Sequence, residues 1–324
     1  MANWTASDIP AQKGRSAVIT GTRGLGFETA LALARAGSEV ILAGRNPGRG
    51  AEAVASIRSE IPLANVRFEQ VDLASLASIA EFTARLRGQR KSLDLLVNNA
   101  GVMRPPKRLE TVDGFELQLG TNYLGHFVLT AQLMPLLRHG TGARVVTLSS
   151  IAARGGAIDF DDLQAQRRYA SMQAYSQSKL ACLMFAFELQ RRSEAGGWGV
   201  ASMAAHPGLS RTDLLASAPG GNGRIGIVLR LLRPVMMQPA WQGALPTLFA
   251  ATAPEAKGGG YYGPDRVSET RGYPTLAKRP PKSLDTHVAG RLWVESERLT
   301  RAVFPTGDDQ GASASAHVVK PLRA

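Results

Sequence analysis

Residues 16–26 read SAVITGTRGLG, and this stretch carries the clearest structural signal in the chain. Its first part, residues 16–20, is a short apolar run rich in β-branched residues, which is typical of a buried strand. A glycine-rich turn follows at once, and an amphipathic helical pattern then extends to about Ala36. A strand, a glycine-rich turn and a helix in this order predict the first unit of an α/β fold.

The alternation of strand and helix patterns continues through most of the sequence. We expect further strands at residues 39–43, 66–71, 93–98, 143–149 and 200–205, and a short seventh strand that begins at 261. We expect later helices at residues 51–60, 76–87, 115–138, 173–194, 240–252 and 284–300. The predicted fold class is α/β, a doubly wound (Rossmann), mostly parallel seven-stranded sheet with helices on both faces.

Size and composition set limits on the organisation of the chain. Its 324 residues are 44% hydrophobic, which is enough to build a large core. We expect one domain over residues 1–305 and a disordered tail, rich in Gly, Ala and Ser, over residues 306–324. Cys182 is the only cysteine, which excludes an intrachain disulfide and favours a reducing, cytoplasmic location. No apolar run approaches the roughly 18 residues of a membrane-spanning helix, and the polar start indicates no signal peptide.

The net charge of +12 raises the question of a nucleic-acid partner. The basic residues are scattered, and Lys/Arg-rich runs with interleaved aromatic residues are absent. We therefore expect no nucleic-acid partner, and we expect no metal. Part of the positive charge would serve a phosphate-rich cofactor, and most of it is solvated surface.

The glycine-rich turn is a candidate phosphate site. It reads Thr20-Gly21-Thr22-Arg23-Gly24-Leu25-Gly26, and glycines let the backbone approach a pyrophosphate at the N-terminus of the following helix. An ordinary turn is the alternative, but the position between the first strand and the first helix favours a nucleotide.

The end of the second strand discriminates between cofactors. Sites for NAD usually place Asp or Glu there, where the acid holds the ribose 2′-hydroxyl. This chain has Ala43-Gly44-Arg45-Asn46 instead, so no acid repels a 2′-phosphate. Arg45 could bind that phosphate and Arg23 could reach it, although either side chain could also be merely solvated. The pattern favours NADPH/NADP+ over NAD(H).

A further signal lies in the run Ala174-Tyr175-Ser176-Gln177-Ser178-Lys179. Tyr175 and Lys179 are four residues apart, so on a helix both side chains leave the same face. An ammonium held near a phenol favours the phenolate, and such a tyrosine can pass a proton to and from an alcohol or ketone oxygen. This spacing often arises by chance, so the other motifs must decide.

These motifs together resemble the short-chain dehydrogenase/reductase family, over about residues 14–300. The resemblance also rests on Asp72-Leu73, Asn98-Asn99-Ala100-Gly101, Asn122, Ser149-Ser150, and His206-Pro207-Gly208 with Thr212. Residues 121–127 and 159–163, and the 25-residue gap from Ser150 to Tyr175, are similar to the retinol-dehydrogenase-like and WW-domain oxidoreductase-like branch.

The resemblance implies four catalytic residues. Ser150 would hydrogen-bond the substrate carbonyl oxygen, and Tyr175 would donate the proton in reduction or accept it in oxidation. Lys179 would bind the nicotinamide ribose and favour the tyrosinate, and Asn122 would hold a water in a proton relay behind it. Two alternatives stay open, since Ser150 could satisfy backbone at a strand end and Asn122 could be an internal polar group of its helix.

The resemblance also implies a set of cofactor contacts. Asp72 would contact the adenine, unless it caps the next helix. Besides Tyr175 and Lys179, the other contacts are Gly21, Thr22, Arg23, Gly24, Leu25, Gly26, Arg45, Asn46, Leu73, Asn99, Ala100, Gly101, and, at the nicotinamide end, Pro207, Leu209 and Thr212. His206 would act mainly through its backbone, and Cys182 would serve helix packing. In the turn, two residues separate Gly21 from Gly24 where the family usually has three, which leaves the place of Arg23 open.

The substrate side is expected to be apolar. Residues 209–238 fall where the family has its variable substrate lid, and they are rich in Ile, Leu, Val and Met. We therefore expect a lipophilic ketone, aldehyde or alcohol as substrate. Packing of this segment on the core or on a second subunit is one alternative, and contact with a membrane surface through Arg224, Arg230 and Arg233 is another.

The leading hypothesis is an NADP(H)-dependent oxidoreductase that interconverts a lipophilic carbonyl compound and its alcohol. A non-catalytic regulator that senses NADP(H), and an epimerase or dehydratase with a tightly held nucleotide, are the alternatives. Family members commonly build a four-helix dimer contact from the helices expected at 115–138 and 173–194, so we expect a homodimer or homotetramer. Leu183, Met184, Phe185 and Leu189 would serve that contact or the core.

Overall fold

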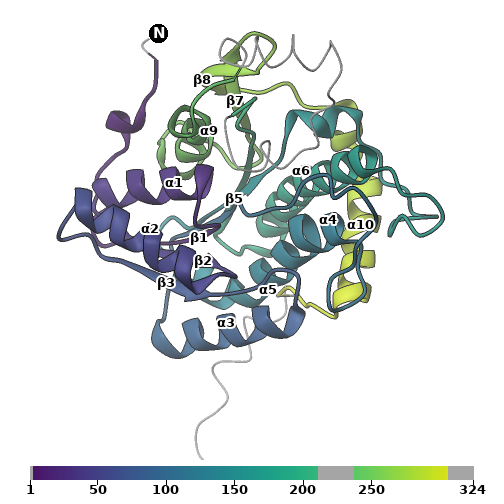
Figure 1. The fold of residues 1–324 in the computed structure, drawn as a ribbon, viewed down its shortest axis with the longest axis horizontal. Coiled ribbons are helices and arrows are strands. Elements are labelled where there is room, and N and C mark those ends of the chain that lie inside the picture. The colour runs from purple at the N-terminus through teal and green to yellow at the C-terminus, as the bar shows by residue number, and fades with distance from the viewer. Residues whose placement is uncertain (1–2, 211–236, 306–324) are drawn as a thin grey trace, which may run out of the picture.

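The computed structural model describes residues 3–210 and 237–305, and Figure 1 shows a central sheet between layers of helices. The strands are β1 (Ser16–Thr20), β2 (Glu39–Gly44), β3 (Val66–Gln70), β4 (Leu95–Asn98), β5 (Arg144–Leu148), β6 (Ala201–Ala205), β7 (Tyr261–Arg266) and β8 (Arg271–Leu276). Their order across the sheet is β3-β2-β1-β4-β5-β6-β7-β8. The order reverses between β1 and β4, and in doubly wound sheets ligands bind in the crevice at such a point.

The parallel sheet and the Rossmann-type fold are confirmed. The pairs from β3 through β7 are all parallel, and every residue of β1 is buried because helices cover both faces of the sheet. The expected strands agree with the observed bounds to within two residues. Alternate residues enter different apolar clusters: Val18 and Ile41 lie in one, and Ile19 and Leu42 lie in the other.

The expected number of strands was too low. The described residues form an 8-stranded sheet, because β8 adds an antiparallel edge next to β7, with Tyr262 opposite Leu276. Gly272 and Pro274 interrupt the apolar alternation of β8, so its sequence does not have the pattern of a strand. An edge position tolerates such residues because one side of the strand needs no partner.

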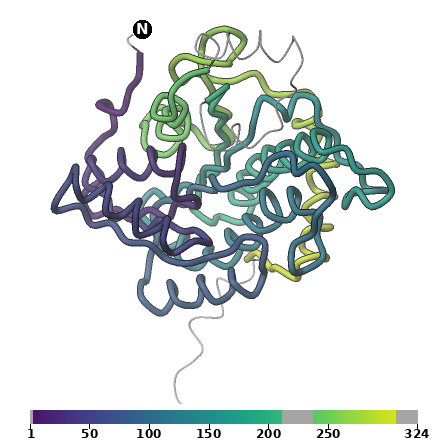
Figure 2. Tube along the Cα trace, viewed as in Figure 1, coloured from purple at the N-terminus to yellow at the C-terminus, as the bar shows by residue number. Residues whose placement is uncertain are grey.

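Helices cover both faces of this sheet (Figures 1 and 2). One apolar cluster contains residues of α1 (Gly24–Arg35), α2 (Pro47–Glu60) and α9 (Ala240–Thr252). The other contains residues of α3 (Leu76–Gln89), α5 (Gly125–Leu137), α6 (Ser171–Gly196) and α10 (Thr286–Thr300). Within the described part of the chain, none of the helices combines the length and the apolar character needed to cross a membrane.

The helix expected at 115–138 is present but interrupted. A short α4 (Leu117–Leu119) leads into a π-helical segment, η2 (Gly120–Leu124), and α5 continues from there. Such π segments occur frequently at functional sites because they shift side chains and carbonyls out of the α-helical register. Asn122 lies in this segment.

The helix α10 packs on α6. Trp293 of α10 lies with its ring centroid 5.8 Å from that of Phe185 and 5.0 Å from that of Phe127. Leu183, Met184, Phe185 and Leu189, for which a subunit contact was the alternative, are all buried in the core of the single chain. The lid expected at 209–238 lies outside the described residues, except for 209, 210, 237 and 238. The tail expected at 306–324 also lies outside them.

Candidate active site

Two adjoining cavities open at the carboxyl ends of the parallel strands. The first cavity has a volume of about 620 Å³ and lies beside the ends of β1, β2, β3 and β4. The second cavity has a volume of about 360 Å³ and lies beside the ends of β5 and β6. Leu25, Asn99 and Gly101 line both cavities, so the two form one continuous cleft.

The glycine-rich turn lines the first cavity with backbone. Gly21 has φ 97° and Gly24 has φ 53°, in the left-handed region that favours glycine. A Cβ atom on Gly21 would lie 2.7 Å from Nδ2 of Asn99, so a side chain does not fit there. Gly26, expected as a cofactor contact, packs behind the turn against the carbonyl group of Gly21 and does not line the cavity. The turn leads into the N-terminus of α1, which suits an anionic group.

A buried hydrogen-bond network supports this turn. Thr20 Oγ1 accepts the backbone N–H groups of Asn99 and Ala100, each at 2.9 Å, and lies 2.9 Å from Nε2 of His126. Nδ1 of His126 lies 2.9 Å from the carbonyl oxygen of Asn122, so Nδ1 carries the proton and Nε2 accepts from the Thr20 hydroxyl.

Burial lowers the pKa of His126 to about 4, with a further contribution from the Lys179 ammonium. The sequence analysis did not single out His126.

Three arginines line the first cavity near the ends of β1 and β2. They are Arg23, Arg45 and Arg49, and all three are exposed. Asn46 Oδ1 accepts the N–H of Arg49 at 3.0 Å, so Asn46 is the N-cap of α2 as well as a lining residue. Asp72 is the one acid among the described residues that line this cavity.

The alternative role of Asp72 as a helix cap is wrong. Ser75 occupies the N-cap of α3, where its side chain accepts the N–H of Ser78. The Oδ1 atom of Asp72 accepts the N–H of Ala74 at 2.9 Å instead, and Leu73 lines the cavity beside it.

The first cavity fits the phosphate-bearing part of a dinucleotide. Its glycines leave the backbone accessible, the N-terminus of α1 favours negative charge, and the three arginines supply guanidinium donors. The residues expected on this side of the cleft line the cavity with the exception of Gly26, and Arg49 lines it in addition.

Ser150, Tyr175 and Lys179 line the second cavity together. Tyr175 and Lys179 stand one turn apart on α6, so both reach the cavity, as their spacing predicted. Nζ of Lys179 donates to the carbonyl oxygen of Leu148 at 3.1 Å, which holds the ammonium at the end of β5. Ser150 Oγ accepts the N–H of Ala152 at 3.2 Å, so Ser150 satisfies backbone and also lines the cavity.

Asn122 lies behind the cleft and lines neither cavity. Its Oδ1 accepts the N–H of Val102 at 2.7 Å, and its Nδ2 donates to the Val102 carbonyl oxygen and to Ser178 Oγ, both at 3.0 Å. A Cβ atom on Gly101 would lie 2.9 Å from Oδ1 of Asn122 and 3.7 Å from Nζ of Lys179. The side chain therefore clamps the segment after β4 against α6, and the proton relay stays a prediction.

Cys182 packs in the core, as expected. Its Sγ donates to the carbonyl oxygen of Asn122 at 3.1 Å, and burial raises the pKa of the thiol. A buried neutral thiol of this kind is not a nucleophile.

Residues 207–210 form another wall of the second cavity, and His206 holds this wall in place. Nδ1 of His206 accepts the N–H of Gly208 at 3.3 Å, and Nε2 donates to Glu269 at 3.0 Å. Glu269 also forms an ion pair with Arg154 at 2.5 Å, and burial lowers the pKa of His206. The side chain of His206 thus has a structural role that the sequence analysis missed. Thr212 lies outside the described residues.

The lining residues that the sequence analysis did not single out include Arg49 in the first cavity, and Arg104 and Met172 in the second. Arg49 lies in the first turn of α2, where the helix dipole disfavours a cation. A cation at this unfavourable position was the signal in the sequence that could have indicated Arg49 as a lining residue. Arg104 has φ 56°, which the sequence does not indicate.

Comparisons with known proteins agree with this geometry. A family model described as short chain dehydrogenase matches residues 15–221. The mouse (Mus musculus) protein named polyprenol dehydrogenase is 42% identical over 315 residues, which is 94% of this chain and 89% of that protein. The human (Homo sapiens) protein named retinol dehydrogenase 13 is 39% identical over 307 residues, 92% of this chain and 88% of that protein.

A solved structure shares the fold of this chain. It is of an uncharacterized protein from Mycobacterium Paratuberculosis, with a TM-score of 0.78 and 38% identity. The similarity covers 94% of this chain and 100% of that one. The chain therefore belongs to the short-chain dehydrogenase/reductase family of oxidoreductases, in its retinol-dehydrogenase-like branch.

Proposed function

We propose that this protein is an NADP(H)-dependent oxidoreductase that interconverts a lipophilic ketone or aldehyde and its alcohol. The observation that carries the proposal is the position of Ser150, Tyr175 and Lys179 on one cavity, directly next to a cavity suited to a dinucleotide. When bound, the nicotinamide cofactor supplies or accepts the hydride.

The residues of the second cavity manage the proton and the substrate oxygen. The Tyr175 hydroxyl donates its proton to the oxygen in reduction and takes it back in oxidation. The Ser150 hydroxyl hydrogen-bonds the same oxygen and orients it. An ammonium has three donors, and Lys179 uses one on the Leu148 carbonyl, so two remain for ribose hydroxyls. Its charge also stabilises the tyrosinate when the proton has left.

The preference for NADP(H) rests on the lining of the first cavity. Arg23, Arg45 and Arg49 supply positive charge near a 2′-phosphate position, and no acid occupies the end of β2 there. A planar guanidinium can make two parallel hydrogen bonds to a phosphate. We therefore expect a lower KM for NADPH than for NADH.

The lipophilic substrate class rests on the second cavity. Most of its lining away from the catalytic residues is apolar, including Met103, Ile151, Ala152, Met172 and Leu209. The names of the two relatives, polyprenol dehydrogenase and retinol dehydrogenase 13, point to the same class. Because cells usually keep NADPH reduced, we propose reduction as the physiological direction.

The test is a screen of NADPH and NADP+ against carbonyls and alcohols, with NADH and NAD+ in parallel. Net NADPH consumption with apolar aldehydes or ketones supports the proposal. A preference for small charged metabolites would overturn the lipophilic class. Turnover without net NADPH consumption would favour an epimerase or dehydratase, and cofactor binding without any turnover would favour a regulator.

A further inference from the structure

The second cavity carries one cation that the proposed chemistry does not use. Arg104 lines this cavity together with Ser150 and Tyr175, although most of the lining is apolar. We propose that Arg104 binds an anionic group of the substrate. On this basis, which rests on the proposed function, the substrate is a lipophilic carbonyl compound or alcohol that also bears a carboxylate.

The backbone at Arg104 is held in an unusual conformation. Its φ is 56°, which costs free energy for a residue with a side chain. The N–H of Arg104 donates to Oε1 of Gln118 at 2.7 Å. Gln118 is fully buried, and its Nε2 donates to Tyr169 Oη at 3.2 Å and to the Ser171 carbonyl oxygen at 3.1 Å. The fold thus maintains a strained position at Arg104 through a buried side chain, as functional sites often do.

The guanidinium of Arg104 lacks a carboxylate partner in the described part of the chain. No ion pair joins it to an acid there, and its Nε atom is buried without a hydrogen-bond partner. Arg108 of the same loop also has one buried nitrogen without a partner, Nη2, but it differs in having an acid partner, since it pairs with Glu110 at 2.5 Å and its Nε donates to the Gln164 carbonyl oxygen at 2.9 Å. A partly buried cation without an acid is unfavourable, and an anion in the cavity would correct this.

The chemistry of the ligand follows from the side chains around it. A guanidinium presents a planar fork of donors that matches the two oxygens of a carboxylate. Met103 and Met172 are flexible apolar side chains on the same cavity, and they suit an alkyl chain between that carboxylate and the reacting carbon. Oxo and hydroxy fatty acids have this combination.

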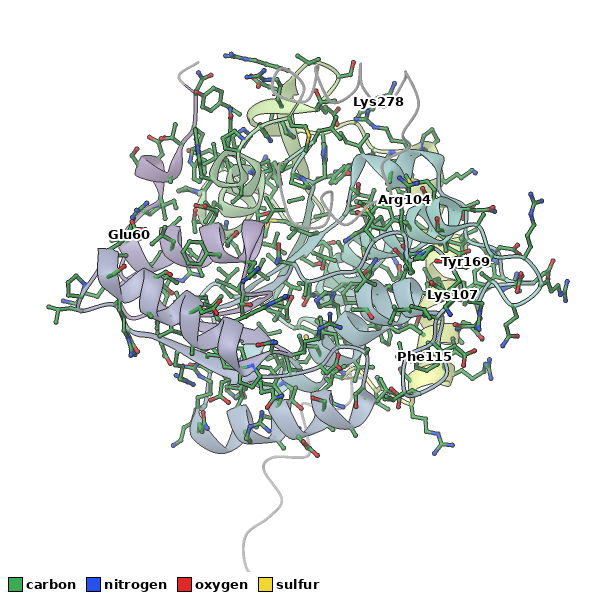
Figure 3. All side chains as sticks on the ribbon, in the orientation of Figure 1. Glu60, Arg104, Lys107, Phe115, Tyr169 and Lys278 are labelled. Atoms are coloured by element: carbon green, nitrogen blue, oxygen red, sulfur yellow. The ribbon has the colours of Figure 1, made fainter. Side chains whose placement is uncertain are left out.

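Lys107 offers a matched control. It is an exposed cation on the same loop, it does not line the cavity, and Figure 3 shows it on the same side of the molecule as Arg104 and Tyr169. The substitution R104M keeps a residue of similar length with the same backbone demands, and R104K keeps the charge without the fork.

The experiment compares ω-oxo fatty acids of increasing chain length with their methyl esters, using NADPH. For the best chain length we expect kcat/KM to favour the acid by roughly tenfold or more, mainly through KM. R104M should remove most of this preference, R104K should retain part of it, and K107M should keep it. Thermal unfolding of each variant checks that the fold is intact.

A second measurement does not need turnover. Calorimetry of dodecanoate and its methyl ester with the NADPH-bound protein should show acid binding that R104M weakens by a similar factor. The inference would be overturned if the wild-type protein showed equal affinity and equal kcat/KM for the acid and the ester. It would also be overturned if R104M kept the preference for the acid. Neither result would contradict the proposed function. Arg104-dependent binding of dodecanoate without turnover of any oxo compound would uphold carboxylate binding at Arg104 but overturn the proposed function, and with it the assignment of the ligand as a substrate.

Discussion

The two cavities of the cleft are built by different means. The first is shaped by backbone at the glycine-rich turn, where Gly21 leaves no room for a side chain. The second is lined by side chains from segments far apart in the sequence, including Arg104, Ser150, Tyr175 and Leu209. Recognition of a phosphate needs backbone N–H groups and leaves little freedom in sequence. Recognition of a substrate depends on side chains, which can differ between relatives that share one fold.

The largest expected effect concerns the second cavity. Tyr175→Phe removes the proton donor but keeps the ring, so we expect turnover to fall by about 10³-fold while NADPH binding is retained. Steady-state kinetics and a fluorescence titration with NADPH measure the two effects. Tyr273→Phe is the matched control, because Tyr273 lies on β8 and lines neither cavity. Normal turnover in the Tyr175→Phe variant would contradict the proposed mechanism.

The next effect concerns His126, which connects Thr20, at the start of the glycine-rich turn, to Asn122 behind the cleft. Its pKa is lowered to about 4 in the folded protein from an ordinary value of 6.5, so the unfolded chain binds the proton first as pH falls. The free energy of unfolding is therefore highest above pH 6.5. It decreases by about 3 kcal/mol as the pH falls towards 4.

Urea unfolding at pH 7 and at pH 4.5 tests this dependence. His126→Gln should weaken it, with the part due to buried His206 remaining, whereas His139→Gln should leave it unchanged, because His139 is exposed. Nuclear magnetic resonance of the wild-type imidazole gives an independent measurement, with a neutral ring expected down to about pH 5. A ring that titrates near pH 6.5 would contradict the hydrogen-bond assignment.

Much of the first cavity could be predicted from the sequence, because its signals are local. The turn at 20–26 and the Arg45-Asn46 pair each lie within a few residues of a strand end. Gly26 was misplaced because the same glycine spacing serves packing inside the turn as well as contact with a ligand.

The remaining features depend on pairs that are distant in sequence. Glu269 meets His206 from the tip of the β7–β8 hairpin, and Gln118 sets the conformation of Arg104. No periodicity or spacing encodes such a contact. The eighth strand was missed for a related reason, since β8 is defined by its pairing with β7 rather than by its own pattern.

A moderate effect is expected when positive charge is removed from the first cavity while the backbone that shapes the cavity is kept. Combining Arg45→Ala with Arg49→Ala removes two guanidinium groups near the expected 2′-phosphate, so we expect KM for NADPH to rise tenfold or more. KM for NADH should stay nearly constant. Arg58→Ala is the control, because Arg58 lies on α2 but outside the first cavity. Equal losses with NADPH and NADH would contradict a role in phosphate recognition.

The smallest effect tests whether backbone alone shapes the first cavity. Gly21→Ala places a Cβ at a φ of 97° and 2.7 Å from Asn99 Nδ2, so both strain and a clash arise beside the expected pyrophosphate. Gly14 is a matched control, since its φ is 81° but no atom lies within 4 Å of a Cβ built there. Both variants should lose about 1–2 kcal/mol of stability through the left-handed backbone. Only Gly21→Ala should also weaken NADPH binding, by roughly tenfold, because only there must Asn99 and the turn move. Equal NADPH affinity in the two variants would mean that the first cavity, like the second, depends on its side chains.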